Sequence, residues 1–224
     1  MPVRILGICG SPVKGGNTEA FLSEALKTAE GLGDVSTESV RLIEKRIGDC
    51  RQCNWCTSEQ EEGSFCCIED DMLEIYPRII AADALLVATP TYAGRLSGYS
   101  AVFMDRFRAL VLGKRYRGVL RNKVGAAMTV SWRRNAGPET ALLSVATAYL
   151  MWGMVLASPG EGGCEFGAVG VSSDGGSGRF VREEKLGVLR DKLGMASARA
   201  LAKRTVELAR IMRAGHAEQG TSGQ

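Results

Sequence analysis

The sequence predicts an α/β domain built on a doubly wound parallel sheet of five strands in the order 2-1-3-4-5. Two observations carry this prediction. Short apolar runs rich in β-branched residues alternate with segments of helical period, and glycine-rich or polar loops follow three of these runs. Such alternation favours parallel strands joined by right-handed crossovers. The chain has 224 residues, 45% hydrophobic and 24% charged, so we expect residues 1–213 to form one domain.

The first half of the chain contains two predicted strands and a segment of different character. Residues 3–9 are predicted to form the central first strand, because such an apolar run suits a strand covered on both faces. Residues 19–30 carry apolar side chains at helical spacing and are followed by two glycines that end the helix. Residues 35–43 form the second strand, nearer an edge. Residues 48–70, rich in cysteine and polar residues, are predicted to be an insertion after it.

The second half continues the alternation. A helix begins at Asp70 and Asp71, and Pro77 marks an early turn or a kink in it. The remaining elements are a buried strand (84–88), a helix (101–112), a strand (124–130), a helix (139–152), a short strand (154–157), a glycine-rich surface loop (158–178) and a helix (183–213). This last helix is either continuous or broken at Gly194. We expect the polar tail, residues 214–224, to be disordered.

The loop after the first strand has the composition of an anion cradle. Its glycines leave backbone N–H groups free to converge, and Asn17 and Thr18 stand where the next helix would be N-capped. A phosphate there would meet these groups at the positive end of the helix. The spacing matches neither GxGxxG nor GxxxxGK[ST], so a monophosphate is favoured. The alternative is an ordinary turn in which Asn17 only caps the helix.

Charge and hydropathy exclude several classes of protein. The net charge of +3 is small, and basic and acidic residues are interleaved, so we expect no nucleic-acid partner. The apolar runs are too short or too interrupted to span a bilayer, so we expect no membrane partner. No signal-peptide pattern precedes Val3. We therefore expect a cytoplasmic protein whose seven cysteines stay reduced.

The cysteines of residues 48–70 have the spacing of a metal site. Cys50, Cys53 and Cys56 are separated by two residues each, and either Cys66 or Cys67 supplies a fourth thiolate. An all-thiolate set suits an iron-sulfur cubane and excludes Mg²⁺ and Ca²⁺. Zinc, a metal-free loop with reactive thiols, and a vicinal disulfide between the last two cysteines remain alternatives. Two further cysteines lie outside this segment. Cys9 is expected to be a small core residue of the first strand, and Cys164 in the glycine-rich loop has no identifiable partner.

The loops that follow the first, third and fourth strands should meet in one crevice, at the point where the strand order reverses. The first loop contains the motifs GSP and GNT, and the second contains PTYAG continuing to SG and FMDR. With these motifs the chain resembles the flavodoxin-like, FMN-binding reductase superfamily over most of residues 3–157, and the cysteines narrow the resemblance to the iron-sulfur flavoproteins. The resemblance implies a flavodoxin-like fold and FMN contacts from Ser11, Pro12, Gly16, Asn17, Thr18, Pro90, Thr91, Tyr92, Ala93, Gly94, Ser131, Trp132, Arg133, Asn135, Gly137 and Glu139.

Two details of the resemblance concern individual residues. The third loop is usually glycine-rich in the family but here carries Trp132, Arg133 and Arg134, which either cover the flavin ring, select an anionic substrate or only pack at the surface. The family's fourth cluster ligand stands two positions before an Ile-x-Asp-Asp-Met segment, which implies Cys66, although the gap from Cys56 is longer than usual. The implied ligands of a [4Fe-4S] cluster are Cys50, Cys53, Cys56 and Cys66.

The predicted function is FMN-dependent oxidoreduction coupled to one-electron transfer through the cluster. The single histidine, His216, lies in the tail, which argues against an imidazole proton shuttle; no catalytic side chain is assigned. NAD(P)H or a ferredoxin-type protein would be the electron donor and a small molecule the acceptor. The resemblance implies a homodimer or homotetramer in which the insertion approaches a neighbouring subunit's flavin. The alternatives are a metal-free NAD(P)H-dependent flavin or quinone reductase, a non-catalytic electron carrier, and a substrate-specific dehydrogenase of a biosynthetic pathway.

Overall fold

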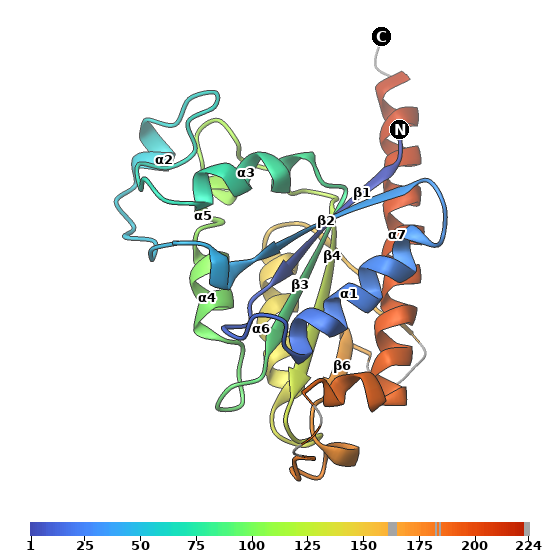
Figure 1. Cartoon of the computed structure of the whole chain (residues 1–224). Helices are drawn as coiled ribbons and strands as arrows, with labels where there is room; N and C mark the ends of the chain where they lie inside the picture. Colours follow the sequence, from blue (N-terminus) through green and yellow to red (C-terminus); the bar gives the residue numbers. More distant parts are fainter. Residues whose placement is uncertain (161–164, 182, 184, 222–224) are drawn as a thin grey trace.

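The computed structural model describes residues 1–160, 165–181, 183 and 185–221, and it confirms the predicted flavodoxin-like α/β fold with a parallel sheet (Figure 1). The strands are β1 (Val3–Cys9), β2 (Val35–Arg41), β3 (Ala84–Pro90), β4 (Val124–Ser131), β5 (Val155–Leu156) and β6 (Ala168–Val171). The main path runs β2-β1-β3-β4-β5, as predicted, and these strands all pair in parallel. The strand order therefore reverses between β1 and β3, where ligands bind in sheets of this kind.

Helices cover both faces of the sheet. They are α1 (Asn17–Glu30), α2 (Trp55–Ser58), α3 (Met72–Ala81), α4 (Gly98–Asp105), α5 (Arg108–Val111), α6 (Pro138–Met151) and α7 (Lys192–Thr221). In Figure 1, α1 and α7 lie on one face, and α3, α4 and α6 lie on the other. No helix in the described residues is both long enough and apolar enough to cross a membrane.

The burial of the central strands follows from their composition. All residues of β3 and β4, and all but one residue of β1, are buried, because each of these strands has a neighbour on both sides and a helical layer on both faces. β2 contains exposed polar residues and lies at the end of the strand order, as its mixed sequence predicts. The two hydrophobic clusters on either side of the sheet thus anchor β1, β3 and β4 most firmly.

The sheet has six strands, so the prediction of five was wrong in one place. Residues 158–178 were expected to form only a surface loop, but Ala168–Val171 pairs with the end of β4 from Met128 to Ser131. The strand is only four residues long and lies among glycines. One of these, Gly167, has a φ of +151°, and a Cβ there would collide with the carbonyl of Ala127, so the glycine permits the approach of the strand.

Several helix limits also differ from the prediction. The last helix begins at Lys192 rather than residue 183 and continues unbroken through Gly194 into residues 214–221, which were expected to be disordered. Gly194 is needed for packing, because a Cβ there would lie 2.8 Å from Gly170 Cα of β6. The predicted helix 101–112 is divided into α4 and α5. The first helix is capped by Gly16, not by Asn17 or Thr18.

Close packing of α6 on β4 gives a prediction for stability. A Cβ at Gly125 would lie 2.5 Å from the ring of the buried Tyr149, whose hydroxyl donates to the carbonyl of Leu85 (3.1 Å). We expect Gly125→Ala to lower the free energy of unfolding by about 2 kcal/mol, because the ring must shift in a packed interior. Urea denaturation would measure this loss. Gly98→Ala is the control, since open space surrounds that position; an equal loss in both variants would contradict the prediction.

Candidate functional site

Three loops meet at the carboxyl edge of the sheet. We call this edge the rim and define it as residues 10–18, 90–97 and 131–139; its loops lie at the lower end of the sheet in Figure 1. The hydroxyl of Ser97 donates to the carbonyl of Gly10 (2.6 Å) and joins the first two loops. A Cβ at Gly137 would lie 2.6 Å from Gly94 Cα, so the second and third loops touch through their backbones. The prediction that these loops share one edge is confirmed.

Buried hydroxyl groups fix the geometry of the rim. Ser97 caps α4 by accepting the Ser100 N–H (3.2 Å), and its own N–H donates to the Thr89 hydroxyl (3.0 Å). Between the ends of β3 and β4, the hydroxyls of Thr91 and Thr129 lie 2.9 Å apart, and the Thr129 hydroxyl donates to the carbonyl of Thr89 (2.9 Å). Because each hydroxyl bonds to an adjacent strand end or loop, the second loop is held to β1 and β4 at the same time.

The first loop offers backbone donors but uses some of its side chains internally. α1 has no side-chain cap, so the N–H groups of its first turn are available to an anion. The buried Ser11 hydroxyl accepts the Val13 N–H (3.1 Å), and the Glu19 carboxylate accepts the Gly15 N–H (2.8 Å). The Asn17 side chain donates to the Lys185 carbonyl (3.4 Å) and accepts the Val188 N–H (3.0 Å). Asn17 therefore ties α1 to the segment before α7.

The third loop contributes one ring of an exposed aromatic pair. Trp132 is 45% exposed and stacks on Phe180, which is 71% exposed, with ring centroids 5.2 Å apart and an interplanar angle of 12°. The Arg133 guanidinium lies 5.1 Å from the centroid of the Trp132 ring. Arg134 has a structural partner, because it forms an ion pair with Asp191 (3.0 Å). Phe180 could not be assigned from the sequence, since it lies 48 positions from its partner in a segment without a recognisable motif.

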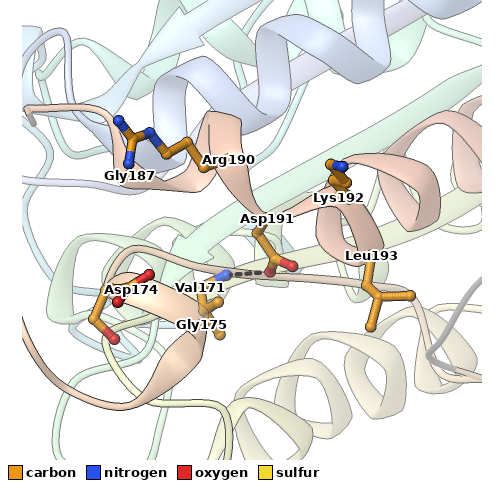
Figure 2. Close-up of a pocket in the computed structure, with 9 residues that line it drawn as sticks. Val171, Asp174, Gly175, Gly187, Arg190, Asp191, Lys192 and Leu193 are labelled. Atoms are coloured by element: carbon orange, nitrogen blue, oxygen red, sulfur yellow. Dashed lines mark hydrogen bonds between the residues drawn. The ribbon is translucent and has the colours of Figure 1, made fainter.

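A pocket of about 270 Å³ lies beside the third loop, between the end of β6 and the start of α7 (Figure 2). The Asp191 side chain points to the backbone of Val171 and accepts its N–H (2.9 Å). Asp174, Arg190 and Lys192 also line the pocket. The same Asp191 carboxylate binds Arg134, so this pocket is linked to the third loop.

The other residues predicted to contact FMN all lie on the rim, with different exposure. Pro90, Gly16 and Thr18 are buried, and Ser131 is buried with its hydroxyl donating to the Arg133 carbonyl (2.6 Å). Those at the surface or partly covered are Pro12, Thr91, Tyr92, Ala93, Gly94, Asn135, Gly137 and Glu139. Ala93 has a φ of +49° and Gly94 one of +74°, and these two residues form the tip of a tight turn closed by backbone hydrogen bonds between Tyr92 and Arg95.

The cysteine segment, residues 48–70, packs beside the helices that follow the second loop of the rim. In Figure 1 it surrounds α2, beside α3 and α5. A pocket of about 560 Å³ is lined by Cys50 and Gln52 of this segment together with Leu96 of the rim. One small cavity, of about 20 Å³, is lined by side chains from this segment and from the helices behind it. The four predicted ligands Cys50, Cys53, Cys56 and Cys66 are among its lining residues, as are Arg106 and Arg108, whereas Cys67 is not.

The sulfur atoms themselves do not converge on a centre. In the described part of the chain, no three His, Cys, Asp or Glu side chains are close enough together to hold a metal ion. Cys53 Sγ instead lies 3.5 Å from Cys67 Sγ, and none of the six described cysteines forms a disulfide. The Trp55 N–H and then the contact with Cys67 lower the pKa of Cys53, whereas burial raises that of Cys56. The predicted ligands therefore share a cavity wall without a preformed metal cage.

A buried ion pair fastens both ends of the cysteine segment to the body of the domain. Arg106 and Asp70 have side chains only 1% and 5% exposed, and their Nη1 and Oδ2 atoms are 2.5 Å apart. Arg106 Nη1 also donates to the carbonyl of Gly48 (2.8 Å), and its Nη2 donates to Cys66 Sγ (3.5 Å). The sequence motif that contains Arg106 was matched to the flavin site, so this role in the cysteine segment was missed.

This pair predicts a pH dependence of stability. Burial opposes ionisation of Asp70, but the hydrogen bonds from Arg106 and Gly48 outweigh it and hold the pKa of the carboxyl below its usual value. A lowered folded-state pKa stabilises the fold above the unfolded value of about 4 and loses that contribution as the pH falls through the folded value. We expect Asp70→Asn to flatten the fall in urea midpoint of the metal-free protein below about pH 4. The same slope in both proteins would contradict this.

Comparison with known proteins adds three findings. Residues 3–164 match the family model described as NADPH-dependent FMN reductase. An iron-sulfur flavoprotein of Methanocaldococcus jannaschii is 32% identical over 94% of this chain and 100% of its own length, and one of Archaeoglobus fulgidus is 35% identical over 91% and 96%. Among solved structures, RosB with bound 8-demethyl-8-formylriboflavin-5'-phosphate superposes with a TM-score of 0.73 at 17% identity, covering 99% of this chain and 88% of that one.

Proposed function

Because this chain belongs to the NADPH-dependent FMN reductase family, and within it to the iron-sulfur flavoproteins, we propose that it is a flavin oxidoreductase that uses FMN together with a [4Fe-4S] cluster. The observation that carries the proposal is the presence of two suitable sites on one chain. The rim supplies backbone donors and loops for a flavin phosphate, and the cysteine segment supplies four soft thiols on one cavity wall.

The rim has the chemistry that FMN requires. The uncapped N–H groups of α1 and the buried Thr18 would hold the phosphate, and the second loop from Pro90 to Gly94 would lie along the ribityl chain and ring. The exposed pair of Trp132 and Phe180 offers a flat apolar surface beside this position, which would exclude water from one side of the flavin. Asn17 would act by fixing the start of α1, since its side chain is already engaged.

The cysteine segment contains the ligand type that an iron-sulfur cluster requires. Thiolates are the ligands of iron-sulfur clusters, and an anionic cluster needs hydrogen-bond donors around it. Arg108 lines the same cavity, and its Nε is buried without a hydrogen-bond partner. Such an orphaned donor is explained by an acceptor in the cavity. The present volume of about 20 Å³ has room for about one water molecule, so the thiols must turn apart to admit a cluster.

When bound, FMN accepts two electrons as a hydride and releases them singly, and a cluster exchanges one at a time. The residues of the chain would position these groups and shield them; none of the rim side chains is assigned as a proton donor. NADPH is the donor that the family description favours, and a ferredoxin-type protein is the alternative. A small molecule would be the acceptor. A reducing cytoplasm would keep the thiols available as ligands.

We also propose that the functional unit is a homodimer or homotetramer. Cys53 and Cys67 of the cysteine segment are exposed, so this segment can approach the flavin of a neighbouring subunit, as the resemblance to the iron-sulfur flavoproteins implies. Light scattering of the loaded protein would give its mass. A monomer that still passes electrons from NADPH to the cluster at full rate would contradict this arrangement.

The proposed function is tested by purification without oxygen, followed by assays of FMN, iron and acid-labile sulfide. We expect about one FMN and about four iron and four sulfide per chain, and bleaching of the flavin by NADPH or by a reduced ferredoxin. A purified chain that contains no flavin and takes up none would contradict the flavin assignment. Flavin without iron or sulfide would contradict the cluster.

A metal-free NAD(P)H-dependent flavin reductase is the second candidate. The absence of a preformed metal cage among the described side chains favours it, because the thiols would then serve only as reactive groups. The two candidates differ in their spectra and composition. Full turnover of FMN by a chain that lacks iron and sulfide after anaerobic reconstitution would establish the metal-free reductase.

A further inference from the structure

Arg106 occupies an unusual place for a charged side chain. Its guanidinium is almost fully buried at the junction of α4 and α5, where the side chain leaves the body of the domain and enters the cysteine segment. One nitrogen, Nη1, donates to Asp70 and to the Gly48 carbonyl at the two ends of the segment. The other, Nη2, divides its contacts between Asp70 Oδ1 (3.3 Å) and Cys66 Sγ (3.5 Å).

The contact distinguishes two adjacent cysteines. Cys66 lines the cavity shared with Cys50, Cys53 and Cys56 and accepts from the guanidinium, whereas Cys67 is exposed and contacts Cys53 instead. We propose that Arg106 is a positioning residue that holds Cys66 as the fourth cluster ligand and, through its charge and its N–H···S hydrogen bond, raises the reduction potential of the cluster. This inference rests on the proposed function, since it requires a cluster in the cysteine segment.

The direction in which Arg106 shifts the reduction potential of the cluster follows from its positive charge. One-electron reduction adds one negative charge to the cluster, and a buried positive charge that donates to a ligand sulfur favours the more negative form. The Asp70 carboxylate beside Arg106 acts in the opposite sense. The interior position strengthens both contributions, because little solvent separates these groups from the sulfur. The chain therefore sets the potential with two opposed charges of fixed geometry.

A purely structural role for the ion pair predicts something different. If Arg106 and Asp70 only fastened the segment, weakening either residue would loosen the same loop and shift the potential in one common direction. Direct electrostatic action gives shifts of opposite sign for the two residues. The sign of the change thus separates the two explanations, and catalytic activity is not needed to read it.

The experiment is an EPR-monitored redox titration of the anaerobically purified, loaded protein. The variants are Arg106→Lys, which keeps a charge for Asp70 but has no second nitrogen for Cys66, and Asp70→Asn, which keeps the shape and an acceptor for Arg106. Arg78→Lys is the matched control, because Arg78 pairs with Glu38 and donates to the Ser39 carbonyl, with no sulfur partner among its described contacts. Iron and FMN contents are measured on every sample.

We expect Arg106→Lys to lower the ratio of reduced to oxidised cluster at a fixed potential by about tenfold, equivalent to about 59 mV for one electron. Asp70→Asn should raise the ratio, and Arg78→Lys should leave it unchanged. An unchanged or raised potential in Arg106→Lys, or a shift of the same sign in both variants, would overturn the proposal. If Arg106→Lys retains no iron, Asp70→Asn still tests the direct effect of charge, because an unchanged or lower ratio in that variant would overturn the proposal. Wild-type protein without iron would instead defeat the proposed function.

Discussion

We expect Gly137→Ala to lower the affinity for FMN by about 100-fold. Gly137 has a φ of +88°, and a Cβ on it would lie 2.6 Å from Gly94 Cα and 2.8 Å from the Gly94 carbonyl oxygen. The backbone of Gly94 cannot rotate away as a side chain could, so the second and third loops must separate. Strain and overpacking of this kind cost about 3 kcal/mol together, which corresponds to about two powers of ten in affinity.

The measurement is fluorescence quenching of FMN during titration with protein from which the flavin has been removed. Gly118→Ala is the matched control, because Gly118 has a similar φ of +83° but no neighbour within 4 Å and lies outside the rim. The control carries the same backbone strain without the contact. Equal FMN affinities for the two variants would show that the contact between the loops does not shape the flavin site.

The second large effect is expected from adjacent cysteines. Cys66→Ala should lower the iron and sulfide content of the anaerobically purified protein by about tenfold or more, since it removes a proposed ligand from the shared cavity. Cys67→Ala should retain both, because Cys67 does not line that cavity. Both variants should keep FMN, because neither cysteine belongs to the rim loops.

Iron and sulfide are assayed together with flavin absorbance, so that cluster loss is read separately from misfolding. Loss of iron from Cys67→Ala with retention in Cys66→Ala would make Cys67 the fourth ligand. Loss of FMN along with iron in Cys66→Ala would contradict the division of the chain into two separate sites. Either result would be visible in a single preparation of each variant.

The predictions from sequence succeeded where burial on both sides imposed a composition. β1, β3 and β4 are continuous apolar runs, and a parallel sheet covered by helices requires such runs. The three loops that follow these strands were placed at one edge because parallel strands end together. β6 was missed because its four residues carry no periodic pattern and depend on one edge of β4 for their conformation.

Long-range contacts explain the remaining errors and omissions. The last helix extends past residue 213 because the helix is already anchored by the buried Leu201, Val206 and Ala209, which local polarity does not reveal. Asn17 appeared suited to cap α1, but its amide reaches the Val188 N–H, 171 positions away. Arg106 was recognised only as part of a flavin motif, because its partners Gly48 and Asp70 lie far from it along the chain.

The shared use of β4 by two short strands has a consequence for self-association. β5 pairs with Val124 and Gly125, and β6 pairs with the far half of the same strand from Met128 to Ser131. Most of the backbone donors and acceptors along that border are therefore already matched, and an extended peptide from another molecule finds no long free template there. β2, at the other border, is the strand whose polar, exposed residues must protect the sheet from edge-to-edge aggregation.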